Sequence, residues 1–266
     1  MHHVFFRQEQ LSADGKELLI RGEDVHHIVR VLRMKEGEEL SASLLSEDGQ
    51  AQPQREYRFG IEEVSADHVL CRLRFIKEEG RELPARITLL QCLPKSDKME
   101  QIVQKAVELG AAEICPVKAK RCVVRLDERK AGAKVHRWQK IAEAAAAQSK
   151  RGNIPQVHEV VSLAEALERT KGFHLKLIPY ELAAFDAAGG EGEHCGGMEE
   201  TRALLDGVKP GETVAVMIGP EGGFEEEEIA LAKAAGYRAI TLGKRILRTE
   251  TAGPAVLAYL MLRLEE

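Results

Sequence analysis

The sequence predicts an α/β protein with two domains, a small β-rich domain followed by a larger domain built on a parallel sheet. Five short strand-like segments fall within the first 76 residues, and strands alternate with helices from residue 85 onward. Two glycine-containing turns near the C-terminus each follow a buried strand. A chain of 266 residues is long enough for one or two domains with a substantial core.

The first 76 residues are expected to form a small β-barrel domain. The predicted strands are residues 3–7, 17–20, 39–45, 57–64 and 68–76. One short helix, near residues 23–32, interrupts them. The segment 77–84 is polar, contains Gly80 and ends in Pro84, so we expect it to link this domain to a second one at 85–266.

The second domain begins with an apolar run at residues 87–93, which predicts a strand covered on both faces. Asp97 and Glu100 have the spacing of a helix start, and apolar residues then repeat with a helical period up to Gly110. A long alanine-rich helix is expected at residues 133–149.

The remaining elements continue this alternation. Ser162 and Glu165 form a capping box, and strands are expected at residues 173–180, 213–218 and 239–242. Because a helix separates each strand from the next, the sheet is expected to be parallel. The glycine-rich residues 181–198 form an irregular insertion to which we assign no chemistry.

The first turn has the sequence Ile218-Gly219-Pro220-Glu221-Gly222-Gly223-Phe224. It fits neither the dinucleotide fingerprint nor the Walker motif. The next helix opens with four glutamates, residues 225–228, which would repel a pyrophosphate. We interpret these glutamates as favourable charges at a helix N-terminus, and we expect a ligand that is poor in phosphate.

The second turn has the sequence Leu242-Gly243-Lys244-Arg245-Ile246-Leu247-Arg248-Thr249-Glu250-Thr251-Ala252. Ligand pockets of open α/β sheets form at the carboxyl ends of strands, where the chain turns toward a helix. Two such turns close together in the sequence therefore predict one shared pocket.

Together the two turns resemble the cofactor loops of the SPOUT (α/β-knot) RNA methyltransferases. Within this superfamily the chain is most similar to the enzymes that methylate N3 of a uridine in 16S rRNA. Further segments match family motifs in the expected order, namely residues 26–33 (HHIVRVLR), 93–100 (LPKSDKME), 104–110 (QKAVELG) and 137–142 (RWQKIA). The chain departs from the family at Lys150, where glycine is more familiar, and at Gly253-Pro254. Because proline is tolerated in the first turn of a helix, we expect only a local adjustment there.

The resemblance implies a PUA-like or OB-like RNA-binding domain, a trefoil knot in the second domain, a homodimer, and S-adenosylmethionine as cofactor. The residues implied to bind the cofactor lie at three strand ends: Ile178, Pro179, Tyr180, Ile218, Gly219, Pro220, Glu221, Gly222, Gly223, Leu242, Gly243, Ile246, Leu247 and Ala252.

Methyl transfer to uridine N3 requires that the N3 proton leave. Arg248 and Arg245 are the candidates for stabilising the uridine anion, and Glu250 or Glu221 is the candidate base. Two alternatives stay open at this point. Glu250 is equally interpretable as a first-turn carboxylate that stabilises the last helix, and Arg248 as its structural partner.

Charge is distributed unevenly along the chain, whose net charge is −5. Residues 117–151 carry 11 Lys/Arg and 3 Asp/Glu, whereas residues 181–228 carry 2 and 13. Binding a polyanion requires a basic patch rather than a basic protein. The candidate contacts to 16S rRNA in the small ribosomal subunit are Arg30, Arg33, Lys35, Lys95, Lys98, Arg121, Arg125 and Arg151.

Several classes of protein are disfavoured. No apolar stretch approaches the ~20 residues of a membrane span, and the five scattered cysteines show no metal-ligand spacing. We therefore expect a cytoplasmic protein with reduced thiols and neither a metal nor a membrane partner. Two alternatives remain open: a SPOUT enzyme that acts on another RNA such as tRNA, and a non-catalytic RNA-binding or ribosome-assembly factor.

Overall fold

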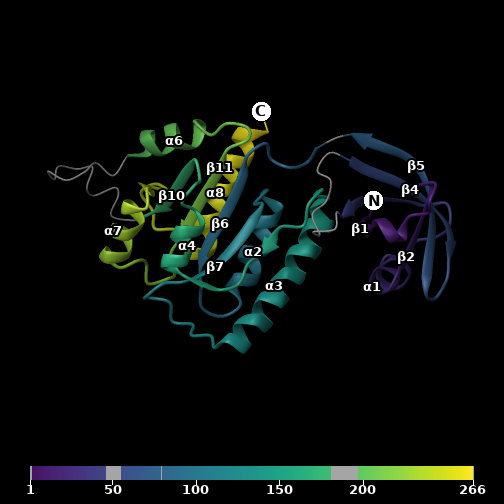
Figure 1. Cartoon of the computed structure of the whole chain (residues 1–266), viewed down its shortest axis with the longest axis horizontal. Helices are drawn as coiled ribbons and strands as arrows, with labels where there is room; N and C mark the ends of the chain where they lie inside the picture. Colours follow the sequence, from purple (N-terminus) through teal and green to yellow (C-terminus); the bar gives the residue numbers. More distant parts are fainter. Residues whose placement is uncertain (1, 46–54, 79, 181–196, 266) are drawn as a thin grey trace. The chain divides into compact units, whose positions relative to one another are not determined.

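The computed structural model describes residues 2–45, 55–78, 80–180 and 197–265 (Figure 1). The chain forms two compact units, which we call unit 1 (Met1–Glu82 and Ala146–Ile154) and unit 2 (Leu83–Ala145 and Pro155–Glu266). The first division, after Glu82, falls inside the predicted linker. The sequence did not predict that Ala146–Ile154 belongs with unit 1.

Unit 1 is built on a five-stranded sheet with the order β1-β3-β4-β5-β2. Its strands are β1 (His3–Arg7), β2 (Glu17–Arg21), β3 (Glu39–Leu45), β4 (Arg55–Val64) and β5 (His68–Glu78). β1 and β3 pair in parallel, and the other pairs are antiparallel. All five predicted strands are present, because alternating apolar residues bury one face of each strand in a common core.

The predicted helix of the first domain is divided into two short elements. α1 spans Glu23–His26, and a π-helical turn follows at His27–Val31. Val25 and Ile28 are buried in the core of unit 1, whereas Val31 is exposed. The basic residues of this segment therefore stand on its solvent side.

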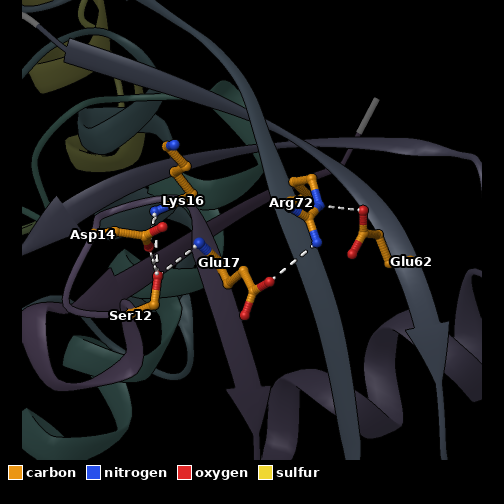
Figure 2. A network of polar contacts seen from close by, with 6 residues as sticks. All are labelled: Ser12, Asp14, Lys16, Glu17, Glu62 and Arg72. Carbon is orange, nitrogen blue, oxygen red and sulfur yellow. Dashed lines mark hydrogen bonds and ion pairs between the residues drawn. The ribbon is translucent and has the colours of Figure 1, made fainter.

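A surface network ties three strands of unit 1 together (Figure 2). Arg72 on β5 donates from Nη2 to Glu17 Oε1 on β2 at 3.1 Å, and its Nε donates to Glu62 on β4. Ser12 accepts from the backbone N–H of Glu17 at 2.9 Å and donates to Asp14 at 2.7 Å, which closes the turn before β2. Exposed ion pairs of this kind contribute about 0–1 kcal/mol each, so they favour the register more than they stabilise the core.

Unit 2 contains a seven-stranded sheet with the order β12-β10-β11-β6-β7-β8, and β9 pairs with β7. The strands are β6 (Arg86–Cys92), β7 (Glu113–Lys118), β8 (Gln156–Val157), β9 (Val161–Ser162), β10 (Leu175–Pro179), β11 (Thr213–Ile218) and β12 (Arg238–Ile240). Every pairing is parallel, which confirms the prediction.

Helices cover this sheet. They are α2 (Lys98–Glu108), α3 (Glu128–Ser149), α4 (Leu163–Arg169), α6 (Met198–Asp206), α7 (Glu226–Ala234) and α8 (Thr249–Leu264). One apolar cluster joins strand residues such as Leu90 and Met217 to Ala166 of α4 and Ile229 of α7. α8 packs against β11, α2 and α6 (Figure 1). The α/β architecture with a parallel sheet is as predicted.

The predicted helix starts had different outcomes. The Ser162–Glu165 capping box forms, with the Ser162 N–H donating to Glu165 Oε2 at 2.7 Å. α2 begins beside Asp97, but the Asp97 side chain makes no capping hydrogen bond. α3 begins at Glu128 rather than residue 133, because the Asp127 carboxylate accepts from the Lys130 N–H at 2.8 Å and extends the helix.

Pro254 lies further into its helix than expected, and the helix continues past it to Leu264. α8 begins at Thr249, so Pro254 lies in its second turn and not its first. A proline there has no N–H to donate to the carbonyl of Glu250, and the helix loses one backbone hydrogen bond close to its start.

Two predictions stay untested by the fold. Most of the predicted insertion, up to residue 196, lies outside the described residues, and Met198 begins α6. The trefoil knot remains a prediction of the family resemblance. Within the described ranges, none of the helices is long and apolar enough to cross a membrane.

Candidate functional site

The predicted turns lie at the same edge of the unit 2 sheet. β10 is hydrogen-bonded to β12 on one side and to β11 on the other, with Pro179 paired to Ile240 and Leu177 to Val216. β6 lies next to β11, with Gln91 opposite Ile218. Because all four strands are parallel, the segments that follow them leave the sheet side by side. We call this place the carboxyl edge.

The first turn depends on glycine for close packing. An added Cβ on Gly219 would lie 3.0 Å from Cε2 of the buried Phe224 ring, and one on Gly222 would lie 3.2 Å from Cβ of Arg121. Gly223 has a φ of 69°, and its N–H donates to the Pro220 carbonyl at 2.9 Å. Larger residues would therefore push the turn away from its neighbours.

The second turn presents both backbone and apolar side chains. Gly243 has a φ of 108°, in the left-handed region that favours glycine. Its N–H donates to Thr241 Oγ1 at 3.3 Å. Leu242 and Leu247 are half-buried, whereas Ile246 is 82% exposed. The turn is thus held at its base and leaves a large apolar side chain uncovered at the carboxyl edge.

The other predicted cofactor residues differ in what they expose. Ile178 and Ile218 are fully buried in the core, so only their backbone can face a ligand. Pro179 and Tyr180 are half-buried at the end of β10, and the Tyr180 N–H donates to the Ile240 carbonyl at 3.1 Å. Pro220 and Ala252 are buried as well.

A buried polar chain that the sequence analysis missed connects the two turns. The Gln91 amide donates to Thr249 Oγ1 at 2.9 Å, and Thr249 Oγ1 donates to the Gly219 carbonyl at 2.7 Å. The chain joins the end of β6, the start of α8 and the first turn. One signal was available in the sequence, since Gln91 is the polar residue near the end of the apolar run at 87–93.

Lys98 brings the two candidate bases together. Its ammonium lies 3.1 Å from Glu221 Oε1 and 3.1 Å from Glu250 Oε2. The backbone N–H of Lys95 also donates to Glu221, at 3.1 Å. The start of α2, the first turn and the start of α8 are therefore held by one cation and two carboxylates.

Both carboxyl groups are held in the ionised form. Burial raises the pKa of Glu221, but hydrogen bonds from its own N–H, the Lys95 N–H and Lys98 outweigh that effect, so the pKa is lowered. For Glu250, burial is opposed by its own backbone N–H, by Lys98 and by Arg248, and its pKa is also lowered. Each is ionised at neutral pH, which leaves it free to accept a proton but makes it a weak base.

Arg245 and Arg248 are exposed at the same edge. Arg248 is the N-cap residue of α8, and its carbonyl accepts from the Ala252 N–H at 2.9 Å. Among the residues that the structure describes, neither guanidinium forms an ion pair, and the ion-pair partner of Glu250 is Lys98. No ion pair joins Arg248 to Glu250, but Arg248 is close enough to lower the pKa of Glu250, so the alternative in which Arg248 is its structural partner stays open.

Glu225 and Glu228, two of the four glutamates after the first turn, make structural contacts. Glu225 caps α7 and forms a capping box with Glu228, as expected for charges at a helix start. The Lys120 ammonium lies 3.1 Å from Glu225, and the Lys120 N–H donates to Glu228 at 2.8 Å. These contacts fix the loop after β7 to the start of α7.

The candidate RNA contacts fall into two groups. Arg30, Arg33, Lys35, Lys95 and Arg125 are exposed. The others make intramolecular contacts: Lys98 as described, and Arg121 by donating to the Gly222 carbonyl at 3.0 Å. Arg151 is buried and donates to the Glu82 carboxylate through Nε, at 3.3 Å, and through Nη2.

The carboxyl edge can hold a compact ligand by backbone and apolar contacts, beside cations that can stabilise a developing anion. The helix N-terminus where a phosphate would bind is already filled by Glu225 and Glu228. In the described part of the chain, no group of three or more His, Cys, Asp or Glu residues has the arrangement of a metal site.

Comparison with known families agrees with this arrangement. The RNA methyltransferase domain family matches residues 81–261, and the RNA methyltransferase PUA domain family matches residues 20–44. The first match contains the whole carboxyl edge, and the second covers part of the sheet of unit 1.

Individual relatives match most of the chain. Ribosomal RNA small subunit methyltransferase E of Bacillus subtilis is 37% identical over 92% of this chain and 89% of its own. The protein of that name from Synechocystis is 30% identical over 91% and 71%. A crystal structure of ribosomal RNA small subunit methyltransferase E from Neisseria gonorrhoeae bound to S-adenosyl methionine aligns with a TM-score of 0.76, 30% identity and coverage of 97% and 96%.

Proposed function

Because this chain belongs to the RNA methyltransferase family of ribosomal RNA small subunit methyltransferase E, we propose that it methylates N3 of a uridine in 16S rRNA, with S-adenosylmethionine as the methyl donor. The observation that carries the proposal is the convergence, at the carboxyl edge, of three parallel strand ends, two glycine turns and two arginines that form no ion pair with described residues. Such a site suits a nucleoside that carries no phosphate.

The residues of the carboxyl edge fit this cofactor. Three glycines of the first turn leave backbone groups uncovered by side chains at the carboxyl edge, namely Gly219, Gly222 and Gly223. Gly243 has a left-handed conformation that would be strained in a residue with a Cβ. Leu242, Leu247 and the exposed Ile246 offer apolar surface; Tyr180 and Pro179 stand between the two turns. When bound, S-adenosylmethionine supplies an electrophilic methyl group on a sulfonium.

The protein's own contribution is to orient the uridine and to stabilise the anion that forms as its N3–H proton leaves. Arg248 and Arg245 supply positive charge, and neither forms an ion pair with a described carboxylate. Glu250 accepts the proton in this proposal, and Glu221 holds the first turn in place. Glu221 is the weaker candidate base because the Lys95 N–H and Lys98 both bind its carboxylate.

Binding of the rRNA draws on exposed cations of both units. In unit 1 these are Arg30, Arg33 and Lys35, and in unit 2 they are Lys95 and Arg125. Contacts of this kind position phosphates and carry little sequence information. We leave Arg151 out of this surface because its guanidinium is buried against Glu82. Lys98 and Arg121 act by holding the first turn.

The proposal includes a homodimer that works in the cytoplasm. The dimer is supported by exposed apolar side chains on unit 2. Leu262 of α8 is 66% exposed, and Ile246 is exposed on the turn before the same helix. Exposed apolar side chains that share one helix and its approach suit a contact with a second copy. Sedimentation analysis of the wild-type protein and of Leu262→Glu tests this part.

A methyl-transfer assay tests the proposed reaction. Tritiated S-adenosylmethionine is incubated with the protein and with unmodified small ribosomal subunits or tRNA, and the labelled nucleoside is then identified. We expect label in 3-methyluridine from the small subunits alone. Label in tRNA would indicate a different RNA substrate. Binding of the subunits without any transfer or cofactor affinity would indicate a ribosome-assembly factor instead.

A further inference from the structure

A polar hollow lies within unit 1, and the proposed methyl transfer does not use it. It is an open hollow whose volume, counted together with the solvent space at its mouth, is about 220 Å³, and its lining includes His3, Arg55, Glu56, Arg81 and Lys150. We call it the His3 hollow. The residues come from β1, from β4, from the chain after β5 and from the Ala146–Ile154 segment, all of which belong to unit 1.

Positive charge exceeds negative charge around the hollow. Arg81 donates to Glu56 Oε2 at 2.6 Å, and Arg58 lies 2.9 Å from Glu56 Oε1, so two guanidiniums share one carboxylate. Lys150 forms no ion pair with the described residues. Arg55 reaches Glu78 only at 3.8 Å. The hollow is therefore suited to an anion.

Lys150 adopts a backbone conformation that is unfavourable for lysine. Its φ is 59°, in the left-handed region where glycine is tolerated without strain. A residue with a side chain is strained at such a position, and residues held in this way are concentrated at functional sites. Here that side chain lines the hollow and adds a cation to it.

His3 adds a buried hydrogen-bond acceptor. Burial lowers the pKa of His3 to about 4, and the nearby cations of Arg81, Arg58 and Lys150 act in the same direction, so the ring is neutral at pH 7. The single hydroxyl hydrogen of Ser41 is directed to the His2 carbonyl at 3.2 Å. The ring hydrogen of His3 is therefore on Nδ1, which donates to Ser41 Oγ at 2.9 Å.

This assignment leaves a lone pair on His3 Nε2. The side chain is 2% exposed, and Nε2 has no hydrogen-bond partner among the described residues. A buried acceptor without a partner is unfavourable, and a ligand hydroxyl would relieve it. The hollow is thus lined by cations suited to an anion, and one of its lining residues, His3, carries a buried acceptor without a described partner.

We propose that the His3 hollow binds the ribose-phosphate backbone of RNA, with a phosphate beside Lys150 and Arg81 and a 2′-hydroxyl donating to His3 Nε2. The inference rests on the proposed function, which supplies an RNA substrate, and it assigns a site for that substrate within unit 1. The 2′-hydroxyl is the group that distinguishes RNA from DNA. The hollow is accordingly a determinant of RNA over DNA.

The variant Lys150→Gly tests the phosphate contact. It removes the ammonium and also relieves the positive φ, so we expect an unchanged or higher Tm together with weaker binding. Against unmodified small ribosomal subunits, Kd should rise roughly fivefold, and the slope of log Kd against log salt should fall by about one. Lys16→Ala removes the same charge elsewhere in unit 1 and serves as the control. Wild-type Kd and slope in Lys150→Gly would overturn the phosphate assignment.

The variant His3→Asn tests the hydroxyl contact. Asparagine can keep the bond to Ser41 and has no counterpart of Nε2. With single-stranded U12 and dU12 as probes, we expect the preference of the wild type for RNA to fall about threefold or more, mainly by loss of RNA affinity. An unchanged preference in a folded variant would show that His3 is only structural.

Calorimetry with S-adenosylmethionine separates these outcomes from those of the proposed function. If every variant binds the cofactor and Lys150→Gly binds RNA normally, the proposal that the His3 hollow binds RNA is refuted and the methyltransferase proposal is retained. If the wild type binds RNA through the hollow but neither binds the cofactor nor transfers a methyl group, the methyltransferase proposal is refuted and the proposed RNA site in the His3 hollow is retained.

Discussion

The two edges of the parallel sheet in unit 2 differ in how completely their charged side chains are paired. At the amino edge, Glu113 at the start of β7 accepts from Arg86 at the start of β6, and it also contacts Thr88 at 3.2 Å and His158 at 3.5 Å. The hydrogen bond from His158, with that from Arg86, lowers the pKa of Glu113 to about 2 despite partial burial. The charged side chains of this group are therefore paired with one another.

At the carboxyl edge the charges are not matched. One ammonium, on Lys98, is divided between Glu221 and Glu250, and the guanidiniums of Arg245 and Arg248 have no ion pair with described residues. Glycines with a positive φ and the exposed Ile246 lie at the same edge. Charges that stabilise a fold find partners inside it, whereas charges kept for a substrate are left without one. The difference identifies the carboxyl edge as the functional one.

The largest expected effect is that of Arg248→Gln. Removing a cation aimed at a developing anion lowers the rate of transfer about 100-fold, while Tm stays unchanged because the side chain is exposed. The measurement is the kcat of tritiated methyl transfer to unmodified small subunits at saturating cofactor. Arg129→Gln, an exposed arginine of α3, is the control. A wild-type kcat in Arg248→Gln would show that the unpaired charge of Arg248 does not contribute to methyl transfer.

The next effect concerns backbone strain at the two edges. Gly243→Ala places a side chain at a φ of 108°, and the strain should weaken cofactor binding about tenfold. Gly211→Ala introduces similar strain at a φ of 84°, just before β11 at the amino edge, with open space for its Cβ. Calorimetric titration with S-adenosylmethionine should show a raised Kd in the first variant only. Equal Kd values would mean that the second turn does not hold the cofactor.

Lys98→Met is expected to have a smaller effect on activity, about tenfold on kcat. Lys98 is a positioning residue that lowers the pKa of Glu221 and Glu250. Without it both pKa values rise, so the acid limb of the kcat–pH profile should move to higher pH. Lys105→Met, which breaks the pair with Glu108 on the same helix, is the control. A lower kcat with an unmoved acid limb would argue that Lys98 serves packing alone.

Glu113→Gln should leave methyl transfer unchanged and alter stability. The lowered pKa means that Glu113 stabilises the fold fully above pH 4.5, and that this contribution is lost as the pH falls toward 2. Allowing for partial exposure, the contribution is about 2 kcal/mol, or about 5 °C in Tm. Thermal unfolding from pH 7 to pH 3 should show a smaller pH dependence in the variant than in the wild type. Loss of transfer at pH 7 with unchanged Tm would reverse the roles of the two edges.

Local pattern was sufficient for most of the fold. The bounds of β1, β3 and β11 agree with the predicted strands, because alternating or continuous apolar residues between turn residues specify a strand within a few positions. The parallel sheet followed from the alternation of strands and helices. From these two inferences, the sequence could also predict that the two turns lie at one edge.

Contacts between residues that lie far apart in the chain were not predicted from the sequence. Gln91 and Thr249 lie far apart in the chain yet form one polar chain with Gly219. Arg151 was expected to contact RNA, but the Glu82 carboxylate binds it within unit 1. The left-handed backbone of Lys150 was not predicted either, although the glycine that is more familiar at this position in the family was an available signal.

By itself, the sequence did not predict β7, β8 and β9, but it determined most of the strands and helices, the family and the two turns that carry the proposed cofactor site. These depend on periodicity and on glycine, which act over a few residues. The tertiary structure alone decided which charges are matched and which are left over. A charge is neutralised only by the neighbours that folding brings within about 4 Å, and sequence separation does not limit which neighbours those are.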